Sequence, residues 1–255
     1  MRKIKCIVTY DGSRFSGYQT QPNQRTVQGE LEKALAKIHK GKQIGVHASG
    51  RTDAGVHAFC QVFHFETSYG IPEEKWKKAL NSLLPGDIHI KRSAEVSSSF
   101  HSRFDVKEKE YRYYVNNSEE PNVFRRNYVF HFPYRLNLQS MQEACRYFEG
   151  SHDFTSFSSA KATTKGSKVR TIYHASCIER DGYIEFIFRG NGFLYNMVRI
   201  MVGTLLDVGQ GRKKPEEIQS IIEKTDRKFA GETAPPQGLY LWDVIYKGNR
   251  EENPL

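Results

Sequence analysis

The stretch Lys3-Ile-Lys-Cys-Ile-Val-Thr-Tyr10 places Ile4, Cys6 and Val8 on one side of an extended chain. A period of two predicts a β-strand with one buried face. Outward from this strand, the first half continues with a helix, two strands, a second helix that begins with a proline, and a closing strand. Their residue ranges are 26–38, 44–48, 59–65, 72–83 and 88–96. This order, βαββαβ, predicts a ferredoxin-like unit.

The second half repeats the same order of patterns, with a hairpin turned by Asp181-Gly182. Its strands are predicted at residues 110–115, 169–178, 183–188 and 239–246. Its helices are predicted at residues 138–148 and 193–208, with an extra helix at 215–224. The predicted fold class is therefore α+β, with two ferredoxin-like halves built on antiparallel sheets. We expect domains at residues 1–104 and 105–247, followed by a short polar tail at 248–255.

The composition indicates which kind of partner and which cellular compartment fit the chain. The chain carries 38 Lys and Arg against 29 Asp and Glu, a net charge of +9, which favours a polyanionic partner. No apolar run approaches the roughly 20 residues that a membrane span needs, and the first residues do not resemble a signal peptide. The 4 cysteines are far apart and form no C-x-x-C pair. A reducing cytoplasm without membrane attachment fits this pattern.

Several charged and polar side chains lie close together in one segment between two predicted strands. This segment is Ser49-Gly-Arg-Thr-Asp-Ala-Gly-Val-His-Ala58. Gly50 and Gly55 permit a tight path with positive φ, and Asp53 lies between them beside Arg51. In the simplest interpretation, Asp53 forms an Asx-type turn and hydrogen-bonds its own backbone.

Arg199 favours a second interpretation. It lies within the apolar helix predicted at 193–208, where a guanidinium is costly unless a carboxylate or phosphate satisfies it. Asp53 is one candidate partner, and the pair would lower the pKa of Asp53 by about 1–3 units. An ionised carboxylate can act as a nucleophile. Alternatively, Arg199 reaches the surface at one edge of the helix.

At these residues the chain resembles the TruA family of tRNA pseudouridine synthases. The resemblance covers nearly the whole sequence and rests on eight motifs in order. They are Tyr10-Asp-Gly-Ser-Arg-Phe-Ser-Gly17, Gln21-Pro-Asn-Gln-Arg-Thr-Val-Gln-Gly-Glu-Leu-Glu32, Gly50-Arg-Thr-Asp-Ala-Gly-Val-His-Ala58, Phe100-His-Ser-Arg-Phe104, Glu110-Tyr-Arg-Tyr-Tyr114, His152-Asp-Phe-Thr-Ser-Phe157, Gly192-Phe-Leu-Tyr-Asn-Met-Val-Arg-Ile-Met-Val-Gly203 and Thr233-Ala-Pro-Pro-Gln-Gly-Leu-Tyr240. Tyr18 departs from the pattern, because the family often has Trp there, and this puts substrate preference in doubt more than activity.

The resemblance implies a role for each of five residues. Asp53 would be the catalytic aspartate, and Arg51 would help to displace the target base. Tyr111 would pack against the uracil, Arg199 would pair with the aspartate, and Leu239 would line the pocket. The reaction needs no cofactor and no metal.

The resemblance also implies partners and an overall arrangement. The two halves would pack around a central RNA-binding cleft, and the protein would work as a homodimer. Its substrate would be tRNA, at uridines 38, 39 and 40 of the anticodon arm. From charge alone, we expect the polar segment 156–168 to be a solvated loop that contacts RNA, through Lys161, Lys165, Lys168 and the adjoining Arg170.

Parts of the sequence also bear on three other functions. A non-catalytic RNA-binding protein could keep the same fold, since fold alone does not determine function. A metal-dependent RNA hydrolase could use Asp53 with His47, His57 or His64, but their spacing is not that of a zinc site, and His57 is expected to pack or hydrogen-bond near the loop. A methyltransferase is disfavoured, because no glycine-rich turn follows a strand as a nucleotide-like cofactor requires.

Overall fold

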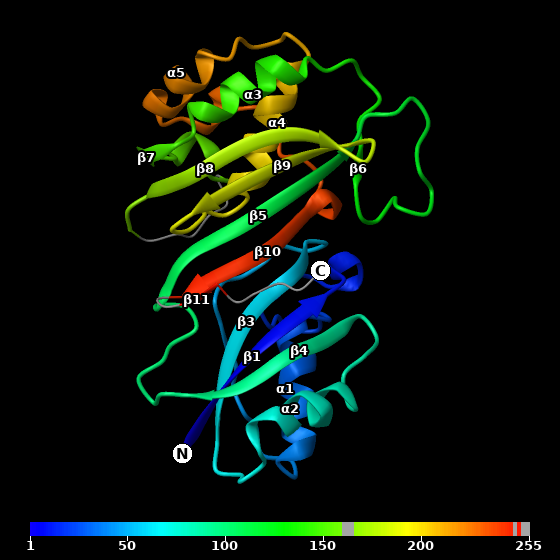
Figure 1. The fold of residues 1–255 in the computed structure, drawn as a ribbon, viewed down its shortest axis with the longest axis vertical. Helices are drawn as coiled ribbons and strands as arrows, with labels where there is room; N and C mark the ends of the chain where they lie inside the picture. The colour runs from blue at the N-terminus through cyan, green and yellow to red at the C-terminus, as the bar shows by residue number, and fades with distance from the viewer. Residues whose placement is uncertain (160–165, 247–248, 251–255) are drawn as a thin grey trace. The chain divides into compact units, whose positions relative to one another are not determined.

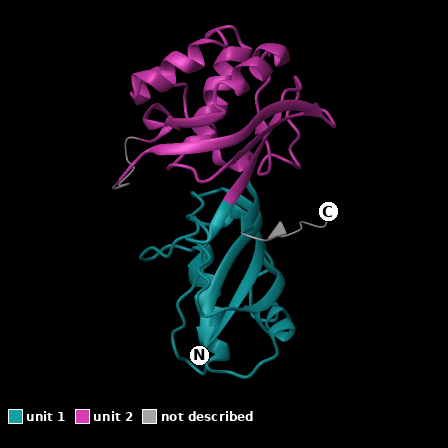
Figure 2. Cartoon of the chain, turned by 60° about the vertical axis from the view of Figure 1, so that its left-hand side comes forward, with its two compact units in different colours: residues 1–107, 240–255 teal, residues 108–239 magenta. Residues whose placement is uncertain are grey.

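A computed structural model describes residues 1–159, 166–246 and 249–250. The chain divides into two compact units (Figure 2). The first unit contains residues 1–107 and 240–255, and the second contains residues 108–239. The chain passes from one unit to the other near the start of β5 (Val106–Asn116) and returns at the start of β10 (Leu239–Tyr246).

The sheet of the first unit contains the strands expected from the first half of the sequence. Its strands are β1 (Arg2–Tyr10), β2 (His47–Ala48), β3 (His57–Thr67) and β4 (Ile88–Val96). β1 runs antiparallel to both β3 and β4, and β2 pairs antiparallel with β3. The predicted βαββαβ order is confirmed in this unit. The predicted strand at 44–48 is shorter than expected, because alternation there reflects burial of Val46 and not backbone pairing.

Two helices, α1 (Val27–Ile38) and α2 (Glu73–Asn81), lie against this sheet (Figure 1). Thr26 begins α1 as its N-cap, with its side-chain oxygen accepting a hydrogen bond from the Gly29 amide at 3.2 Å. Trp76 of α2 is fully buried and meets Phe65 of β3 edge to face, with ring centroids 5.0 Å apart. The alternating apolar residues of β1 complete this core.

The last long strand, β10, has the predicted bounds but joins the first unit. Tyr240 and Leu241 pair in parallel with His57 and Ala58 of β3, and β11 (Asn249–Arg250) pairs antiparallel with β10. The sequence order assigned this strand to the second half. Periodicity indicates that a segment is a strand, but it carries no information about the sheet that the strand will join.

The second unit is a mainly antiparallel sheet with helices on one face (Figure 1). Its remaining strands are β6 (Phe130–His131), β7 (Gly150–Asp153), β8 (Val169–Arg180) and β9 (Tyr183–Gly190). Its helices are α3 (Leu138–Arg146), α4 (Met197–Gly209) and α5 (Glu217–Lys224). The predicted hairpin turn is confirmed, since Asp181 and Gly182 have φ of 52° and 77°. The α+β class is thus confirmed as well.

The described residues also form short 3₁₀ helices, which are η1 (Gly12–Arg14), η2 (Thr155–Phe157), η3 (Arg227–Phe229) and η4 (Pro236–Gly238). Helix α4 begins four residues later than the apolar pattern predicts. Asn196 has a φ of 61°, in the left-handed region, and the preceding Leu194 is buried outside the helix. A buried turn therefore extended the apolar pattern beyond the helix itself.

Tyr18 is only 2% exposed and packs near Tyr10, with ring centroids 6.4 Å apart. This burial makes the residue part of the core of the first unit, so its side chain is not at a surface that substrate could reach. Its hydroxyl has no hydrogen-bond partner among the residues that the structure describes. Burial also raises the pKa of this phenol well above its ordinary value.

A Tyr18→Phe variant is expected to be as stable as the wild type or more stable, by up to about 1 kcal/mol. The substitution keeps the ring and removes a buried polar group that forms no bond. Urea denaturation measures the change as a shift of the midpoint at constant slope. A clearly lower midpoint would show that the hydroxyl makes a stabilising bond in solution.

Candidate active site

Residues 49–56 connect β2 to β3 and carry the motif singled out from the sequence. The Ser49 amide donates to the Val62 carbonyl at 2.7 Å, which ties the start of the loop to β3. The Val56 amide donates to the Asp53 carbonyl at 3.1 Å, and Gly55 between them has a φ of +77°. These are features of a type II turn with its glycine in the third position. The expected positive φ is confirmed for Gly55 and is wrong for Gly50.

The turn that follows β1 packs directly on this loop. The Tyr18 amide donates to the Thr52 carbonyl at 3.0 Å, and the Gly55 amide donates to the Phe15 carbonyl at 3.3 Å. Gly12 approaches so closely that a Cβ there would lie 2.0 Å from the carbonyl oxygen of Val56. Two motifs that are about 40 residues apart thus form one substructure.

His57 has the structural role expected from the sequence. It is buried, its Nδ1 accepts a hydrogen bond from the Gly12 amide at 3.0 Å, and its ring stacks on Tyr240 at 4.7 Å. The ring therefore joins the turn after β1 to the end of the loop.

Exposure alternates along the loop. Thr52 is buried, Asp53 is half-buried and Arg51 is exposed. A half-buried carboxylate can meet a substrate while its backbone stays anchored, and an exposed guanidinium can reach a polyanion. The loop thus presents one carboxylate and one guanidinium from a fixed turn.

The other predicted site residues, Tyr111, Arg199 and Leu239, belong to the second unit. Tyr111 lies on β5, is buried, and meets Phe193 edge to face at 5.0 Å. Arg199 lies on α4, where its Nε donates to the Ala234 carbonyl at 2.7 Å and its Nη1 to Asn196 Oδ1 at 2.9 Å. A backbone carbonyl and a side-chain amide therefore accept hydrogen bonds from the Arg199 guanidinium, for which the sequence predicted a carboxylate or phosphate as partner.

The segment 156–168 differs from the expected solvated loop at its start. Ser156 is fully buried, and its hydroxyl donates to the Ile221 carbonyl at 2.6 Å; Phe157 is fully buried as well. The sequence could not indicate this burial, because a serine whose hydroxyl is satisfied by a buried carbonyl cannot be distinguished by residue type from a solvated serine.

The basic residues expected to contact RNA lie later in that segment. Lys161 and Lys165 lie outside the described residues. Lys168 is half-buried, and Arg170 donates to the carbonyls of Ser167 and Val169. Burial lowers the pKa of the Arg170 guanidinium.

His47, His64 and His101 form a cluster in the first unit. The rings of His47 and His64 stack at 5.0 Å, and those of His64 and His101 meet edge to face at 4.9 Å. The Ser102 amide donates to His64 Nδ1 at 3.2 Å. Within the described part of the chain, no group of three or more His, Cys, Asp or Glu side chains has an arrangement that could hold a metal ion.

Burial lowers the pKa of His64 from 6.5 to about 4, with a smaller contribution from the charges of His47, His101 and Lys3; Asp105 opposes the shift. Since the unfolded chain binds the proton more readily, protonation favours unfolding. We expect the free energy of unfolding to fall as pH drops from 6.5 towards 4. A His64→Gln variant should show a shallower dependence in urea titrations across this range. An unchanged slope would contradict the assignment.

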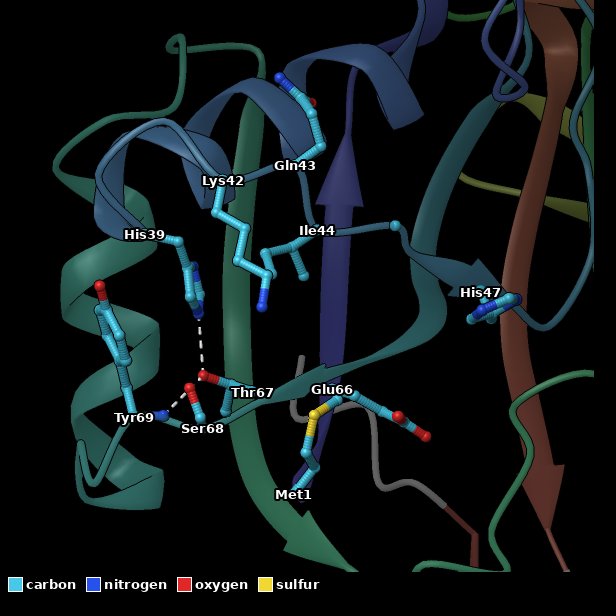
Figure 3. Close-up of a pocket in the computed structure, with 11 residues that line it drawn as sticks. Met1, His39, Lys42, Gln43, Ile44, His47, Glu66, Thr67, Ser68 and Tyr69 are labelled. Atoms are coloured by element: carbon cyan, nitrogen blue, oxygen red, sulfur yellow. Dashed lines mark hydrogen bonds between the residues drawn. The ribbon is translucent and has the colours of Figure 1, made fainter.

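A surface pocket of the first unit lies apart from the motif residues. Figure 3 shows His39, Lys42, Glu66 and Tyr69 among the side chains that line it. Neither Arg51 nor Asp53 contributes to its lining. The pocket is therefore not the site predicted from the sequence.

Two further observations concern the cysteines and the helices. Cys6, Cys60, Cys145 and Cys177 are all buried free thiols. Among the described residues, no helix combines the length and apolar character that a membrane span requires.

Comparison with known proteins identifies the family. A family model described as tRNA pseudouridine synthase matches residues 6–105 and 144–247. A protein named tRNA pseudouridine synthase A from Oceanobacillus iheyensis is 59% identical over 249 residues, which are 98% of this chain and 98% of the relative. Proteins of that name from a Geobacillus species and from Anoxybacillus flavithermus are each 58% identical over 96% of this chain, and over 98% and 99% of their own lengths. The chain therefore belongs to the tRNA pseudouridine synthase family, whose members are isomerases.

Proposed function

We propose that this chain converts uridine to pseudouridine at positions 38, 39 and 40 of the tRNA anticodon arm, with Asp53 as the catalytic nucleophile. The observation that carries the proposal is the anchored turn that begins at Asp53, in a chain that belongs to this family over nearly its full length. The half-buried carboxylate and the exposed Arg51 beside it fit a reaction on a base held outside its helical stack.

The other site residues would act on the displaced base. Arg51 would help to displace it, at a cost of a few kcal/mol of lost stacking. Tyr111 would pack against the uracil ring, and Leu239 would line the pocket around it. Arg199 would pair with Asp53 and keep the carboxylate ionised.

The chemistry balances without an added reactant. The N1–C1′ bond of uridine breaks and a C5–C1′ bond forms, while C5 loses its hydrogen to solvent and N1 gains a proton. Nothing is oxidised or hydrolysed, so Asp53 needs no cofactor or metal to assist it. Its carboxylate can attack C6, attack C1′, or remove a proton to give a glycal; all three routes use the same ionised group.

The partners follow from the same proposal. The net charge of +9 favours binding of tRNA, and Lys161, Lys165, Lys168 and Arg170 would contact its phosphates. We further propose that the protein is a cytoplasmic homodimer, in keeping with its buried free thiols and its family. Light scattering at micromolar concentration distinguishes a dimer from a 29.4 kDa monomer.

The loss of hydrogen from C5 provides the test. Unmodified tRNA transcribed with uridine tritiated at C5 should release tritium to water when incubated with the purified chain, in buffer that contains EDTA. A transcript with cytidine at positions 38, 39 and 40 should release none. If the chain binds the first transcript tightly but releases no tritium, it is a non-catalytic RNA-binding protein.

A further inference from the structure

A buried amide side chain lies beneath the Asp53 loop. Gln61 of β3 is 0% exposed, in a strand that is otherwise mostly apolar. Its Nε2 donates to the Gly50 carbonyl at 2.9 Å, and its Oε1 accepts from the Ser49 hydroxyl at 2.5 Å and from the Val62 amide at 3.1 Å. A buried amide is tolerated where its donors and acceptors are satisfied, as they are here.

A buried pair of hydroxyl groups holds the same loop two residues further on. The hydroxyls of Tyr10, at the end of β1, and Thr52 lie 2.7 Å apart, and both residues are buried. Burial raises the pKa of Tyr10, so its hydroxyl keeps its proton at neutral pH. Thr52 is thus held through its side chain by Tyr10 and through its carbonyl by the Tyr18 amide.

These bonds matter because residues 50–56 form neither helix nor strand. A loop without regular backbone pairing depends on such contacts for its shape. The last anchored residue before Asp53 is Thr52, its immediate neighbour. A rotation of the Thr52 peptide would redirect the Asp53 carboxylate, and displacement of a reacting group by 1 Å can lower a rate about 100-fold.

We propose that the Tyr10–Thr52 hydroxyl pair, together with Gln61, is a positioning network that sets the direction of the Asp53 carboxylate. The proposal rests on the proposed catalytic role of Asp53. Tyr10, Thr52 and Gln61 do not touch the substrate; they act through the loop backbone. The network therefore contributes to the chemical step and not to tRNA affinity.

The test compares variants that remove or keep the Thr52 hydroxyl. Thr52→Val, which keeps the shape of the side chain, is expected to lower the single-turnover rate about 10- to 100-fold, with the Kd for tRNA within about threefold of wild type. Thr52→Ser restores the hydroxyl and should recover most of the rate. Tyr10→Phe removes the partner hydroxyl and should reproduce the effect of Thr52→Val, and the double variant should be no slower than Thr52→Val alone.

Thr67 offers a matched control in the same unit. It is 2% exposed, and its hydroxyl oxygen lies 2.8 Å from His39 Nε2 and accepts from the Tyr69 amide at 3.0 Å (Figure 3). Thr67→Val removes comparable buried bonds far along β3 from the loop. It should lower the melting temperature about as much as Thr52→Val does, while the single-turnover rate well below that temperature stays at the wild-type value.

Several outcomes overturn the proposal. Wild-type rates in both Thr52→Val and Tyr10→Phe would show that the hydroxyl pair positions nothing. An equal loss of rate in Thr67→Val would show that the effect is general destabilisation.

If Asp53→Asn abolishes the reaction while the Thr52 and Tyr10 variants stay fast, only the positioning role fails. If Asp53→Asn itself stays fast, the proposed function of Asp53 fails, and the positioning role fails with it. If Thr52→Val does not fold, Tyr10→Phe and Thr52→Ser decide the question.

Discussion

Replacement of Asp53 by Asn is expected to lower the single-turnover rate of pseudouridine formation by on the order of 10⁴-fold, with tRNA affinity nearly unchanged. The amide has the size of the carboxylate but is a poor nucleophile and a poor base, and loss of such a group in other enzymes costs rates of this order. The bonds that anchor the loop on either side involve the Asp53 carbonyl, Thr52 and Gly55, which the substitution leaves in place. Tritium release from C5 at saturating enzyme measures the rate.

Asp181→Asn is the matched control. Asp181 lies in the hairpin turn between β8 and β9 with a φ of 52°, a conformation that asparagine adopts as readily. Its rate should equal that of the wild type. A rate for Asp53→Asn within tenfold of the wild type would remove Asp53 from the chemical step.

Gly12→Ala is expected to lower the free energy of unfolding by about 3 kcal/mol or more and to abolish most of the activity. A Cβ at this position would lie 2.0 Å from the carbonyl oxygen of Val56 and 2.4 Å from its carbonyl carbon. The contacts are with backbone, so no rotamer change relieves them. Either the turn after β1 or the Asp53 loop must move, and the hydrogen bond from the Gly12 amide to His57 would be strained in both cases.

Gly70→Ala controls for the loss of a glycine as such. Nothing lies within 4 Å of a Cβ built on Gly70, and its φ is not in the left-handed region. Its stability should stay within about 0.5 kcal/mol of the wild type in urea denaturation. Unfolding of Gly12→Ala at the same urea concentration as the wild type would contradict the close contact between Gly12 and Val56.

The sequence predicted most elements, because their patterns are local. Strands β4 and β10 have the bounds that alternation indicated, and α1 begins one residue after its capping Thr26. The errors have a common physical origin. An apolar pattern reports burial, and a buried turn such as that at Leu194 or a buried serine such as Ser156 follows burial without following the expected backbone.

The site was predictable only in part for a related reason. Asp53 and its neighbours form a contiguous motif, whereas the network beneath them joins Tyr10, Thr52 and Gln61 from three places in the chain. One signal was present, since a glutamine on the same side of a strand as Phe63 and Phe65 is unusual in a core. Its partners could not be named, because they depend on how the loop folds back onto β3.

The most direct test of the central claim is to map pseudouridine in one unmodified tRNA after incubation with wild type and with Asp53→Asn. Carbodiimide treatment followed by primer extension locates each modified base. We predict stops in the anticodon arm, at positions 38 to 40, with wild type alone and in the presence of EDTA. Equal binding of tRNA by both proteins without any stop from either would contradict the account, and Asp53 would then be only a residue of the turn.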